Sequence, residues 1–403
     1  MKKQIKIISG LNWGDEGKGL VTNFLSKPES LVVLSSNSSQ RGHTVVHKGF
    51  RHVFRHFGSG TLKGAATYLT QDFLVNPVMF REEYEKLSIM GIQPKVYCRA
   101  SNLIVTPYDM LSNQITEEKV RNGSCGCGVW AARTRMNVLA EKEFREKFFS
   151  VGGSEFRAGL QKTEGFYLNS HSSNAMMQEF CTDIARGNFE DDMNFFRTHV
   201  NIIYSDEEEK ELLHSFDEIL FENSQGLLLD MEYCWDEAHT TPAHVGARIP
   251  SCVIARNFYP DEFEMNAYYI SRSYFTRHGN GPMGELGECT KESINPFIED
   301  KTNVPNPWQG DLRYGLISET DVRNMLDRLE RDVRHHLMGK LIPTNVNMVV
   351  THTNEYAGIM KKIASIAKSS MREYTFRKMR FYESDNEETL LEVYRQYEEK
   401  SLE

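Results

Sequence analysis

The absences in this sequence exclude several classes of protein. Its seven cysteines are scattered and form no Cys-x-x-Cys pair, so neither a disulfide framework nor a zinc site is expected, and a reducing compartment fits best. Acidic residues outnumber basic ones, and the net charge of −9 speaks against a surface that binds a nucleic-acid backbone. The apolar runs are too short for a signal peptide or a membrane span. We therefore expect a cytoplasmic protein that binds neither nucleic acid nor membrane.

Short apolar runs alternate with helical patterns along the 403 residues, and the hydrophobic content of 40% is enough to bury a large core. The predicted strands are residues 5–8, 31–34, 45–46, 102–105, 218–221 and 346–351, and the predicted helices are residues 20–25, 81–90 and 322–337. This alternation predicts an α/β fold in which flanking helices cover a large, mainly parallel central sheet. We interpret residues 1–403 as a single domain.

Three further segments have a distinctive composition. Residues 270–317 and 366–385 are irregular and rich in glycine, proline, asparagine and arginine, so we predict long functional loops there. Residues 385–400 are highly charged with spaced apolar positions, a pattern typical of an amphipathic helix with a solvated face.

A glycine-rich segment, Gly10 to Gly19, lies between the first predicted strand and the first predicted helix. A loop in this position presents backbone N–H groups and a helix N-terminus to phosphate oxygens. It is not a Walker A loop, because Asn12 stands where the first glycine would be and Gly19 follows Lys18 in place of serine or threonine. Its unusual residue is Asp15, which would repel phosphate unless it binds Mg²⁺ or acts as a base; the alternative is a helix N-cap.

Four sequence blocks make the pattern specific. They are NWGDEGKG at 12–19, RGHTVV at 41–46, FENSQGLLLD at 221–230 and YFTRHGNGPMGEL at 274–286. In this order they resemble the signature segments of the adenylosuccinate synthetase family, whose members join L-aspartate to carbon 6 of a purine nucleotide at the expense of a nucleoside triphosphate. The resemblance implies a P-loop-related fold, one catalytic domain over the whole chain, Mg²⁺ as the cofactor and a two-fold homodimer.

The chemistry that the resemblance implies begins with activation of the purine 6-oxo group. A base removes the N1 proton, O6 attacks the γ-phosphoryl group, and the aspartate amine then displaces phosphate from the 6-phosphoryl intermediate. Asp15 matches the family's base and magnesium ligand, and the carbonyl of Gly42 would complete the magnesium shell. His43 matches the acid that stabilises the transferring phosphoryl group, whereas a lone histidine is more often a plain surface or core residue.

The resemblance also assigns binding residues. The triphosphate would contact Asn12, Gly14, Glu16, Gly17, Lys18, Gly19, Gly42, Thr44 and Asn354. The purine nucleotide would contact Asp15, Ser39, Gln40, Ser124, Cys125, Arg135, Gln225, Thr240, Thr241 and His278. L-Aspartate would contact Thr302, Asn303 and Arg313. Alternatives stay open at several positions: Arg133 could replace Arg135, Gln225 could merely cap a turn, and Lys301 or Arg272 could replace Arg313. The segment that contains Asn354 could be only a turn at a strand end, with the donor base held by other residues.

Several ligand-facing segments depart from the family pattern. The family's NAGHT reads here QRGHT at 40–44, its arginine-rich aspartate loop reads NPWQGDLRYG at 306–315, and its guanine-reading TKLD becomes THTN at 351–354. This pattern is similar to a bacteriophage branch of the family, which acts on dGMP to make the succinylated precursor of 2-aminoadenine for modified DNA. We therefore expect dGMP, L-aspartate and ATP as substrates, in the host cytoplasm if the chain is viral.

Two other functions stay open from the sequence. An ordinary adenylosuccinate synthetase would use IMP and GTP, and a catalytically silent homologue would bind nucleotides without releasing phosphate. The presence of both Asp15 and His43 disfavours the silent homologue. His278 replaces a smaller family residue near the ribose, where it would crowd a 2′-hydroxyl, and Asn354 replaces a guanine-reading aspartate. These two replacements favour dGMP as the acceptor and ATP as the donor.

Overall fold

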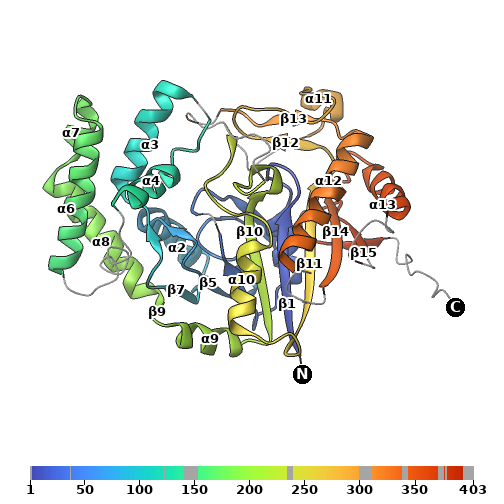
Figure 1. Ribbon diagram of the computed structural model, residues 1–403, viewed down its shortest axis with the longest axis horizontal. Helices are drawn as coiled ribbons and strands as arrows, with labels where there is room; N and C mark the ends of the chain where they lie inside the picture. Colours follow the sequence, from blue (N-terminus) through green and yellow to red (C-terminus); the bar gives the residue numbers. More distant parts are fainter. Residues whose placement is uncertain are drawn as a thin grey trace.

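A ten-stranded sheet organises the molecule (Figure 1). The computed structural model describes residues 2–36, 38–121, 123–139, 153–233, 239–298, 308, 310–337, 344–370, 376 and 379–393. The strands of the main sheet are β1 (Lys3–Gly10), β2 (Leu31–Leu34), β5 (Ala66–Leu69), β7 (Val96–Arg99), β9 (Asn201–Ile203), β10 (Glu218–Gly226), β11 (Phe263–Arg272), β14 (Thr344–Thr351), β15 (Met379–Glu383) and β16 (Leu391–Val393). Three small pairs join β3 (His43–His47) with β4 (Phe50–Phe54), β6 (Leu74–Val75) with β8 (Leu103–Ile104), and β12 (Phe275–Arg277) with β13 (Arg313–Gly315).

The strand order across the main sheet is β16-β15-β14-β11-β1-β10-β2-β5-β7-β9. Every neighbouring pair in it is parallel except β15 with β16. Parallel neighbours need crossover connections, and helices supply them on both faces of the sheet. The predicted α/β fold with a large, mainly parallel sheet is therefore confirmed.

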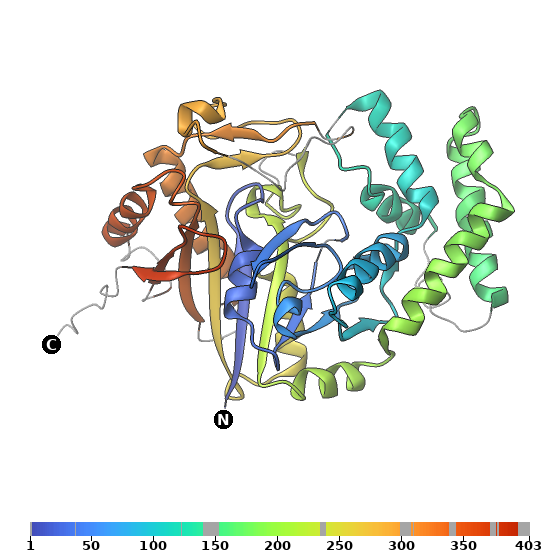
Figure 2. The same ribbon diagram turned by 180° about the vertical axis from the view of Figure 1, so that it is seen from behind.

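The helices are α1 (Lys18–Leu25), α2 (Pro77–Ile89), α3 (Pro107–Val120), α4 (Val129–Leu139), α6 (Gly153–Ser170), α7 (Ala175–Phe180), α8 (Asp183–His199), α9 (Asp206–His214), α10 (Arg248–Asn257), α11 (Lys291–Ile294), α12 (Glu319–Asp332) and α13 (Ile359–Ser370). Helices α10 and α12 cover the face of the sheet seen in Figure 1, and α1 and α2 cover the face seen in Figure 2. Successive side chains of β1 point to opposite faces of the sheet, so Ile7 packs in one hydrophobic core and Ile8 in the other. No helix in the described ranges is long and apolar enough to cross a membrane.

Most of the predicted elements are found. Residues 5–8, 31–34, 218–221 and 346–351 lie in β1, β2, β10 and β14, and the predicted helices overlap α1, α2 and α12 with its π-helical continuation at Val333–Leu337. The predicted strands at 45–46 and 102–105 correspond to β3 and β8, which pair outside the main sheet. Sequence analysis missed β5, β7, β9 and β11, although β11 pairs with the whole length of β1.

The prediction of a helix over residues 385–400 is wrong for residues 385–393. Leu391–Val393 form strand β16, which pairs antiparallel with β15, and residues 394–403 lie outside the described residues. Backbone pairing with β15 has outweighed the local helical pattern. The segments 270–317 and 366–385 are also not wholly loops, because they contain β12, α11 and β13 in the first case and the end of α13 with β15 in the second.

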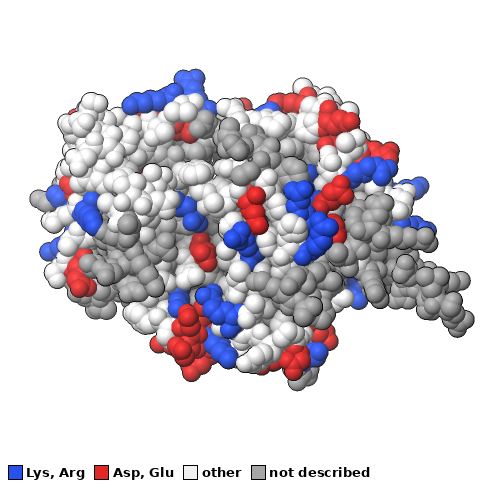
Figure 3. All heavy atoms as spheres, viewed as in Figure 1, with Lys and Arg blue, Asp and Glu red and all other residues white. Residues whose placement is uncertain are grey.

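Lysine and arginine side chains are interspersed with aspartate and glutamate on the face shown in Figure 3. As far as the described residues cover this face, they do not gather into one continuous basic surface.

Candidate active site

The glycine-rich segment forms a loop between β1 and α1, at the edge of the sheet where β10, β11 and β14 also end. Gly14 and Gly17 take positive φ angles of 104° and 89°, and Asp15, which is not a glycine, takes 56°. A side chain held in this region is uncommon and often marks a functional site. Gly17 is the N-cap of α1, so the alternative that Asp15 caps the helix is wrong.

Asp15 lies beside His278, a residue of the loop that follows β12. Its Oδ2 is 3.5 Å from Nε2 of His278, and the two side chains are 24% and 20% exposed. The structure therefore brings together two residues that the sequence assigned to the purine nucleotide. Both remain accessible to a ligand.

Two predicted triphosphate contacts, Asn12 and Glu16, turn their side chains into the protein interior. The amide of Asn12 donates to Oγ of Ser271 and accepts from Nη2 of Arg328, each at 3.0 Å. Glu16 accepts from the backbone N–H of Asn12 and lies 3.3 Å from Nζ of Lys18. Burial raises the pKa of Glu16. These contacts brace the loop from within. Because the side chain of Lys18 is itself only 2% exposed and pairs with Glu16, the backbone N–H groups of the loop are the groups best suited to phosphate.

His43 belongs to a buried cluster around Glu222, a residue of β10. Its Nδ1 lies 2.6 Å from Oε1 of Glu222, and Nη2 of Arg41 lies 3.0 Å from Oε2. The N–H and the hydroxyl of Ser59 also donate to this carboxylate. Although burial opposes ionisation, Arg41 and His43 hold the pKa of Glu222 at about 2.

The protonation state of His43 follows from this cluster. Burial, assisted by the charge of Arg41, lowers the pKa of His43 to about 4 even though Glu222 acts in the opposite direction. The imidazole is therefore neutral at pH 7, with its Nδ1–H donated to Glu222 and Nε2 as the other ring nitrogen.

Gly19 allows α1 to lie directly against β3. A Cβ atom at this position would come within 2.9 Å of the carbonyl oxygen of Thr44 and 3.0 Å of the Cβ of His43. Glycine therefore replaces the serine or threonine of a Walker A loop for a packing reason. The close approach also brings Lys18 near enough to His43 to help lower the pKa of that histidine.

Several residues that the sequence assigned to the purine nucleotide, the substrate that accepts the phosphoryl group, come from distant segments and meet beside the loop. Nε2 of Gln40 donates to Oγ1 of Thr241 at 3.2 Å, and Sγ of Cys125 lies 3.8 Å from Oε1 of Gln40. Gln225, at the end of β10, takes a φ of 61°, and its backbone packs 3.7 Å from the position that a Cβ of Gly14 would occupy. The positive φ of Gln225 is a second conformational outlier in this site.

The other residues predicted to contact the purine nucleotide lie close to these in the sequence. Ser39 is fully buried, and its carbonyl accepts from Nη1 of Arg55 at 3.1 Å. Oγ of Ser124 accepts from Nδ2 of Asn113 at 2.8 Å. Thr240 is half-buried next to Thr241.

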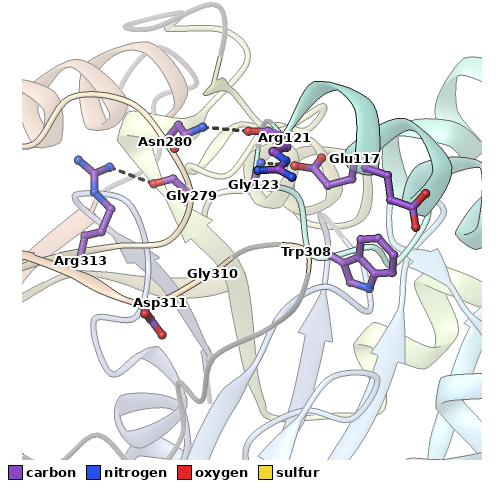
Figure 4. A pocket seen from close by; sticks show the side chains of 10 residues that line it. Glu117, Arg121, Gly123, Gly279, Asn280, Trp308, Gly310, Asp311 and Arg313 are labelled. Atoms are coloured by element: carbon purple, nitrogen blue, oxygen red, sulfur yellow. Dashed lines mark hydrogen bonds between the residues drawn. The ribbon is translucent and has the colours of Figure 1, made fainter.

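A cavity of about 630 Å³ opens between the end of α3 and the loops around β12 and β13 (Figure 4). Its lining residues are Glu117, Glu118, Arg121, Gly123, Gly279, Asn280, Trp308, Gly310, Asp311 and Arg313. The guanidinium of Arg313 is oriented by Glu288 at 2.8 Å and by the carbonyl oxygens of Gly279 and Gly281 at 2.9 Å and 3.0 Å. These acceptors fix Arg313 at the wall of the cavity, next to the loop that carries His278.

Other predicted site residues are not brought to this cavity. Arg135 is fully buried and pairs with both oxygens of Asp109 at 2.8 Å and 2.9 Å, while Tyr167 donates to the same carboxylate. Arg135 is thus a core residue, which corrects the assignment of this side chain to a nucleotide phosphate. Of the two arginines, Arg133 is the half-buried one.

The residues predicted to bind the donor base and L-aspartate differ in exposure, and some lie outside the described residues. Asn354 is exposed in the turn after β14. Arg272, an alternative for aspartate binding, is buried and lies 3.5 Å from Glu355. Thr302 and Asn303, together with Lys301, lie outside the described residues.

Sequence analysis missed the residues that hold His43. Glu222 stands inside the FENSQG block, and an acidic residue within a predicted buried strand is a signal that could have identified it, since a buried charge needs a partner. Arg41 was noted only as a departure from the family pattern. Ser59 carries no recognisable signal, because its contact with Glu222 spans two distant segments.

A second cluster of potential metal ligands occurs within the described residues. Ligand atoms of Asp230, Glu232 and His244 lie within 4.8 Å of one another. Asp230 already accepts from the backbone N–H groups of Val245 and Glu232, and Glu232 lies 2.9 Å from Nη1 of Arg248. These contacts indicate an ion-pair network that fixes the loop after β10.

Comparison with known proteins places these features in context. A family model described as adenylosuccinate synthetase matches residues 7–302. The adenylosuccinate synthetase of Borrelia recurrentis (strain A1) is 26% identical over 382 residues, covering 86% of this chain and 84% of that protein. Another relative, the adenylosuccinate synthetase of Gloeothece citriformis (strain PCC 7424), is 26% identical over 380 residues, covering 85% of this chain and 80% of that protein.

Two solved structures share the fold. Fully ligated adenylosuccinate synthetase from Plasmodium falciparum matches with a TM-score of 0.65 at 14% identity, covering 88% of this chain and 78% of that chain. Succinoaminodeoxyadenylate synthetase of cyanophage S-2L, bound to dGMP and to dATP as an energy donor, matches with a TM-score of 0.61 at 15% identity, covering 97% of this chain and 96% of that chain.

Proposed function

The chain belongs to the adenylosuccinate synthetase family and is a carbon–nitrogen ligase of that type, and from this premise we propose that it joins L-aspartate to dGMP at the expense of ATP. O6 of dGMP takes the γ-phosphoryl group, and the aspartate amine then displaces phosphate from carbon 6. The products are N6-succino-2-amino-2′-deoxyadenylate, ADP and phosphate, and the nucleotide is a precursor of 2-aminoadenine in DNA. The observation that carries the proposal is the approach of His278 to Asp15 at 3.5 Å.

Asp15 has the properties of the base in this reaction. Its carboxylate is accessible, and the loop holds it in a conformation that side chains rarely adopt. Abstraction of the N1 proton makes O6 a better nucleophile. His278 lies next to Asp15, and by the family resemblance the residue at this position is close to the ribose of the purine nucleotide. Crowding of a 2′-hydroxyl there would favour deoxyribose by about 1–3 kcal/mol.

His43 is suited to stabilise the transferring phosphoryl group. A phosphoryl oxygen that approaches Nε2 adds negative charge, which favours the protonated imidazole, and Glu222 stabilises that cation through Nδ1. Arg41 and Ser59 keep Glu222 ionised and fixed. The cluster therefore allows His43 to gain a proton where the reaction needs a donor.

The residues present also fit the magnesium ion that the family implies. The Asp15 carboxylate and the Gly42 carbonyl supply oxygen atoms, which are the ligands that Mg²⁺ prefers. Gly42 is exposed at the start of β3, immediately before His43. The ion would neutralise part of the charge on the triphosphate. We also propose a homodimer, in which Arg133 of a second copy contacts the acceptor phosphate in place of Arg135.

Two observations bear on the choice of substrates. The cyanophage protein, bound to dGMP and dATP, resembles this chain over nearly its full length. The curated relatives, by contrast, are named adenylosuccinate synthetases, which favours IMP and GTP as the alternative pair. The position of Asn354 in the turn after β14 supports ATP, because an asparagine amide offers adenine both a donor and an acceptor.

The test is phosphate release by the purified protein with L-aspartate and Mg²⁺, using dGMP, GMP or IMP in combination with ATP or GTP. We expect the highest kcat/KM with dGMP and ATP and a mass-identified succinylated nucleotide. A kcat/KM with IMP that equals or exceeds that with dGMP would indicate an ordinary adenylosuccinate synthetase. Nucleotide binding without phosphate release in any combination would support a silent homologue.

A further inference from the structure

Two contacts join the glycine-rich loop to the end of β12. Cζ of Arg277 lies 5.3 Å from the centre of the Trp13 ring, and Nε2 of His278 lies 3.5 Å from Oδ2 of Asp15. The contacts lie side by side, because Arg277 and His278 are consecutive and Trp13 and Asp15 are two residues apart. A change in the first contact would therefore displace the second.

The two contacts differ in burial. Arg277 is 2% exposed and Trp13 is 9% exposed, whereas the side chains of Asp15 and His278 remain accessible. A cation over an aromatic ring is held more strongly where water is excluded, but an ion pair at an accessible site does little to fix its own geometry. The buried pair is therefore the one that fixes the positions of both.

The Trp13 ring is held by a second residue of β12. It packs edge-on against Phe275, with ring centres 5.1 Å apart and an interplanar angle of 79°. Side chains two positions apart on a strand share a face, so Phe275 and Arg277 contact the same ring. The loop is thus anchored to β12 at Trp13.

Arg277 also holds the turn that follows His278. Its Nη1 donates to the carbonyl oxygen of Pro282 at 2.6 Å, and a Cβ atom on Gly281 would lie 2.2 Å from its Nη2. Gly281 has a φ of 106°, which only glycine adopts readily. Since His278 lies between Arg277 and Gly281 in the chain, the backbone is fixed on both sides of this histidine.

Arg313 contacts the same turn from the neighbouring strand. It is the register partner of Arg277 in the pair β12 and β13, and its Nη1 donates to the carbonyl oxygens of Gly279 and Gly281 (Figure 4). Arg313 lines the cavity, whereas Arg277 is buried. Arg277 can accordingly affect a ligand only through the residues that it holds.

We propose that Arg277 is a positioning residue for sugar selectivity, which holds His278 beside Asp15 so that its ring excludes a 2′-hydroxyl of the acceptor nucleotide. The inference rests on the proposed function and adds to it a residue that touches no substrate. Loss of Arg277 should relax the preference for a deoxyribonucleotide. An arginine that only stabilises the core would instead lower the free energy of unfolding and affect both sugars alike.

The first experiment measures kcat and KM for dGMP, GMP, dIMP and IMP in the wild type, Arg277→Lys and Arg277→Met. We expect the wild type to prefer the deoxyribonucleotide about tenfold in kcat/KM. Arg277→Met should reduce this ratio to about threefold or less, chiefly through a lower KM for the ribonucleotide relative to the deoxyribonucleotide. Arg277→Lys should lie between them, because it keeps a cation near the ring but loses the planar fork. KM for ATP should stay within about twofold.

Two further variants separate positioning from general packing. Arg81→Met is the matched control, because Arg81 of α2 also lies over an aromatic ring, that of Phe195 on α8 at 5.0 Å, and neither helix carries a predicted site residue. Its sugar preference should equal that of the wild type. His278→Val removes the ring through which Arg277 acts, so Arg277→Met should no longer change the sugar ratio in this background. Should Arg277→Met fail to fold, the same comparisons are made with Arg277→Lys.

Urea unfolding tests the buried contact without any substrate. In a double-mutant cycle, Arg277→Met and Trp13→Leu should be coupled by about threefold or more in the unfolding equilibrium constant, because either change removes the same contact. The cycle of Arg81→Met with Trp13→Leu should be additive. Additivity in the Arg277 cycle would overturn the claim that Trp13 fixes this arginine.

The four acceptors distinguish failure of this inference from failure of the proposed function. If IMP or dIMP is the better acceptor and the sugar ratio still falls in Arg277→Met, Arg277 keeps its role and only the base of the proposed acceptor changes. If dGMP is preferred and a folded Arg277 variant keeps the wild-type sugar ratio, or raises KM equally for both sugars, the inference alone is overturned. A wild type that does not discriminate between the sugars on either base overturns both.

Discussion

At the scale of single residues, the two central side chains of the site differ in their surroundings. Asp15 is accessible in a loop beside His278, whereas His43 is buried and held by Glu222. Substitution of an accessible acid removes its catalytic group with little effect on packing. Substitution within a buried hydrogen-bonded pair also lowers the free energy of unfolding. Substitutions outside the buried cluster therefore give the clearest tests of function.

Replacing Asp15 with asparagine should abolish the basic group while keeping its size and hydrogen-bonding capacity. We expect kcat for phosphate release to fall by roughly 10² to 10⁴, with an unchanged unfolding midpoint, because general-base catalysis contributes on this order. Asp261→Asn, an exposed change in the loop before β11, is the matched control. Activity of Asp15→Asn within a few-fold of the wild type would reject the assignment.

Arg313 is expected to bind a carboxylate of L-aspartate, because its planar guanidinium is fixed at the wall of the cavity. Replacement by leucine should raise KM for aspartate by about tenfold or more and leave KM for both nucleotides within about twofold. Arg323→Leu on the exposed face of α12, where the arginine pairs with Glu319, serves as the control. An unchanged aspartate dependence would transfer this role to another residue, such as Lys301.

Asn354 is expected to read the base of the phosphate donor. The wild type should prefer ATP over GTP in competition at equal, subsaturating concentrations. Asn354→Asp should gain activity with GTP, since a carboxylate accepts from both N1–H and the 2-amino group of guanine, a change of about 1–3 kcal/mol. Should the wild type prefer GTP, the idea is wrong; should the variant gain no GTP activity, Asn354 lies outside the base site.

At the scale of elements, the site depends on how closely α1 packs against β3. Gly19 is the contact point, and Lys18 and His43 extend from the two elements on either side of it. The helix therefore fixes the distance between the phosphate loop and the buried histidine. A small change in this packing should affect catalysis more than stability, because active-site geometry tolerates less displacement than the fold does.

Gly19→Ala tests this contact. The added Cβ would lie 2.9 Å from a backbone oxygen, and the overpacking cost of about 1–3 kcal/mol is partly offset by the gain of about 1 kcal/mol in helix propensity. We expect kcat to fall at least tenfold with a modest loss of stability. Gly165→Ala in α6 is the matched control, because its Cβ would meet no atom within 4 Å and should stabilise the protein. Wild-type kcat in Gly19→Ala would show that the spacing of α1 and β3 does not matter.

At the scale of the whole molecule, buried neutral histidines make the fold sensitive to mild acid. Burial lowers the pKa of both His43 and His56, and neither side chain has room for a solvated charge. A lowered folded-state pKa means that the unfolded chain binds more protons between the two pKa values. The stability that His43 contributes is therefore fully present above pH 6.5 and is lost as the pH falls from 6.5 towards 4, and His56 contributes a loss in the same direction.

Urea unfolding at pH 7.5 and pH 5 measures this loss. For His43, the shift from 6.5 to about 4 corresponds to about 2 kcal/mol of stability lost between these two pH values. Glu222, with a pKa of about 2, adds its own loss only below about pH 4.5. Asp332 acts in the opposite direction within the window, because burial raises its pKa to about 7 and its protonation stabilises the fold as the pH falls. The contribution of His43 is therefore isolated by comparing the wild type with a variant that lacks this histidine. His43→Gln should reduce the difference between the two pH values by about 2 kcal/mol. A pH dependence identical to that of the wild type would exclude His43 as a source.

The sequence by itself determined the α/β class, the strand–loop–helix unit at residues 5–25 and the family. These features depend on local patterns: apolar runs, glycines that permit positive φ, and contiguous blocks that carry their own chemistry. Asp15, Lys18 and His43 are predicted as site residues in this way. The resemblance needed no knowledge of which strands are neighbours.

Only the tertiary structure decided which distant residues cooperate. It placed Glu222 and Ser59 around His43, brought His278 to Asp15, and turned Arg135 into a partner of a buried carboxylate. It also made residues 391–393 an edge strand where the local pattern predicts a helix. These outcomes follow from pairings between segments far apart in the chain, and the free energy of such pairings depends on burial and on partners that no local window of sequence contains.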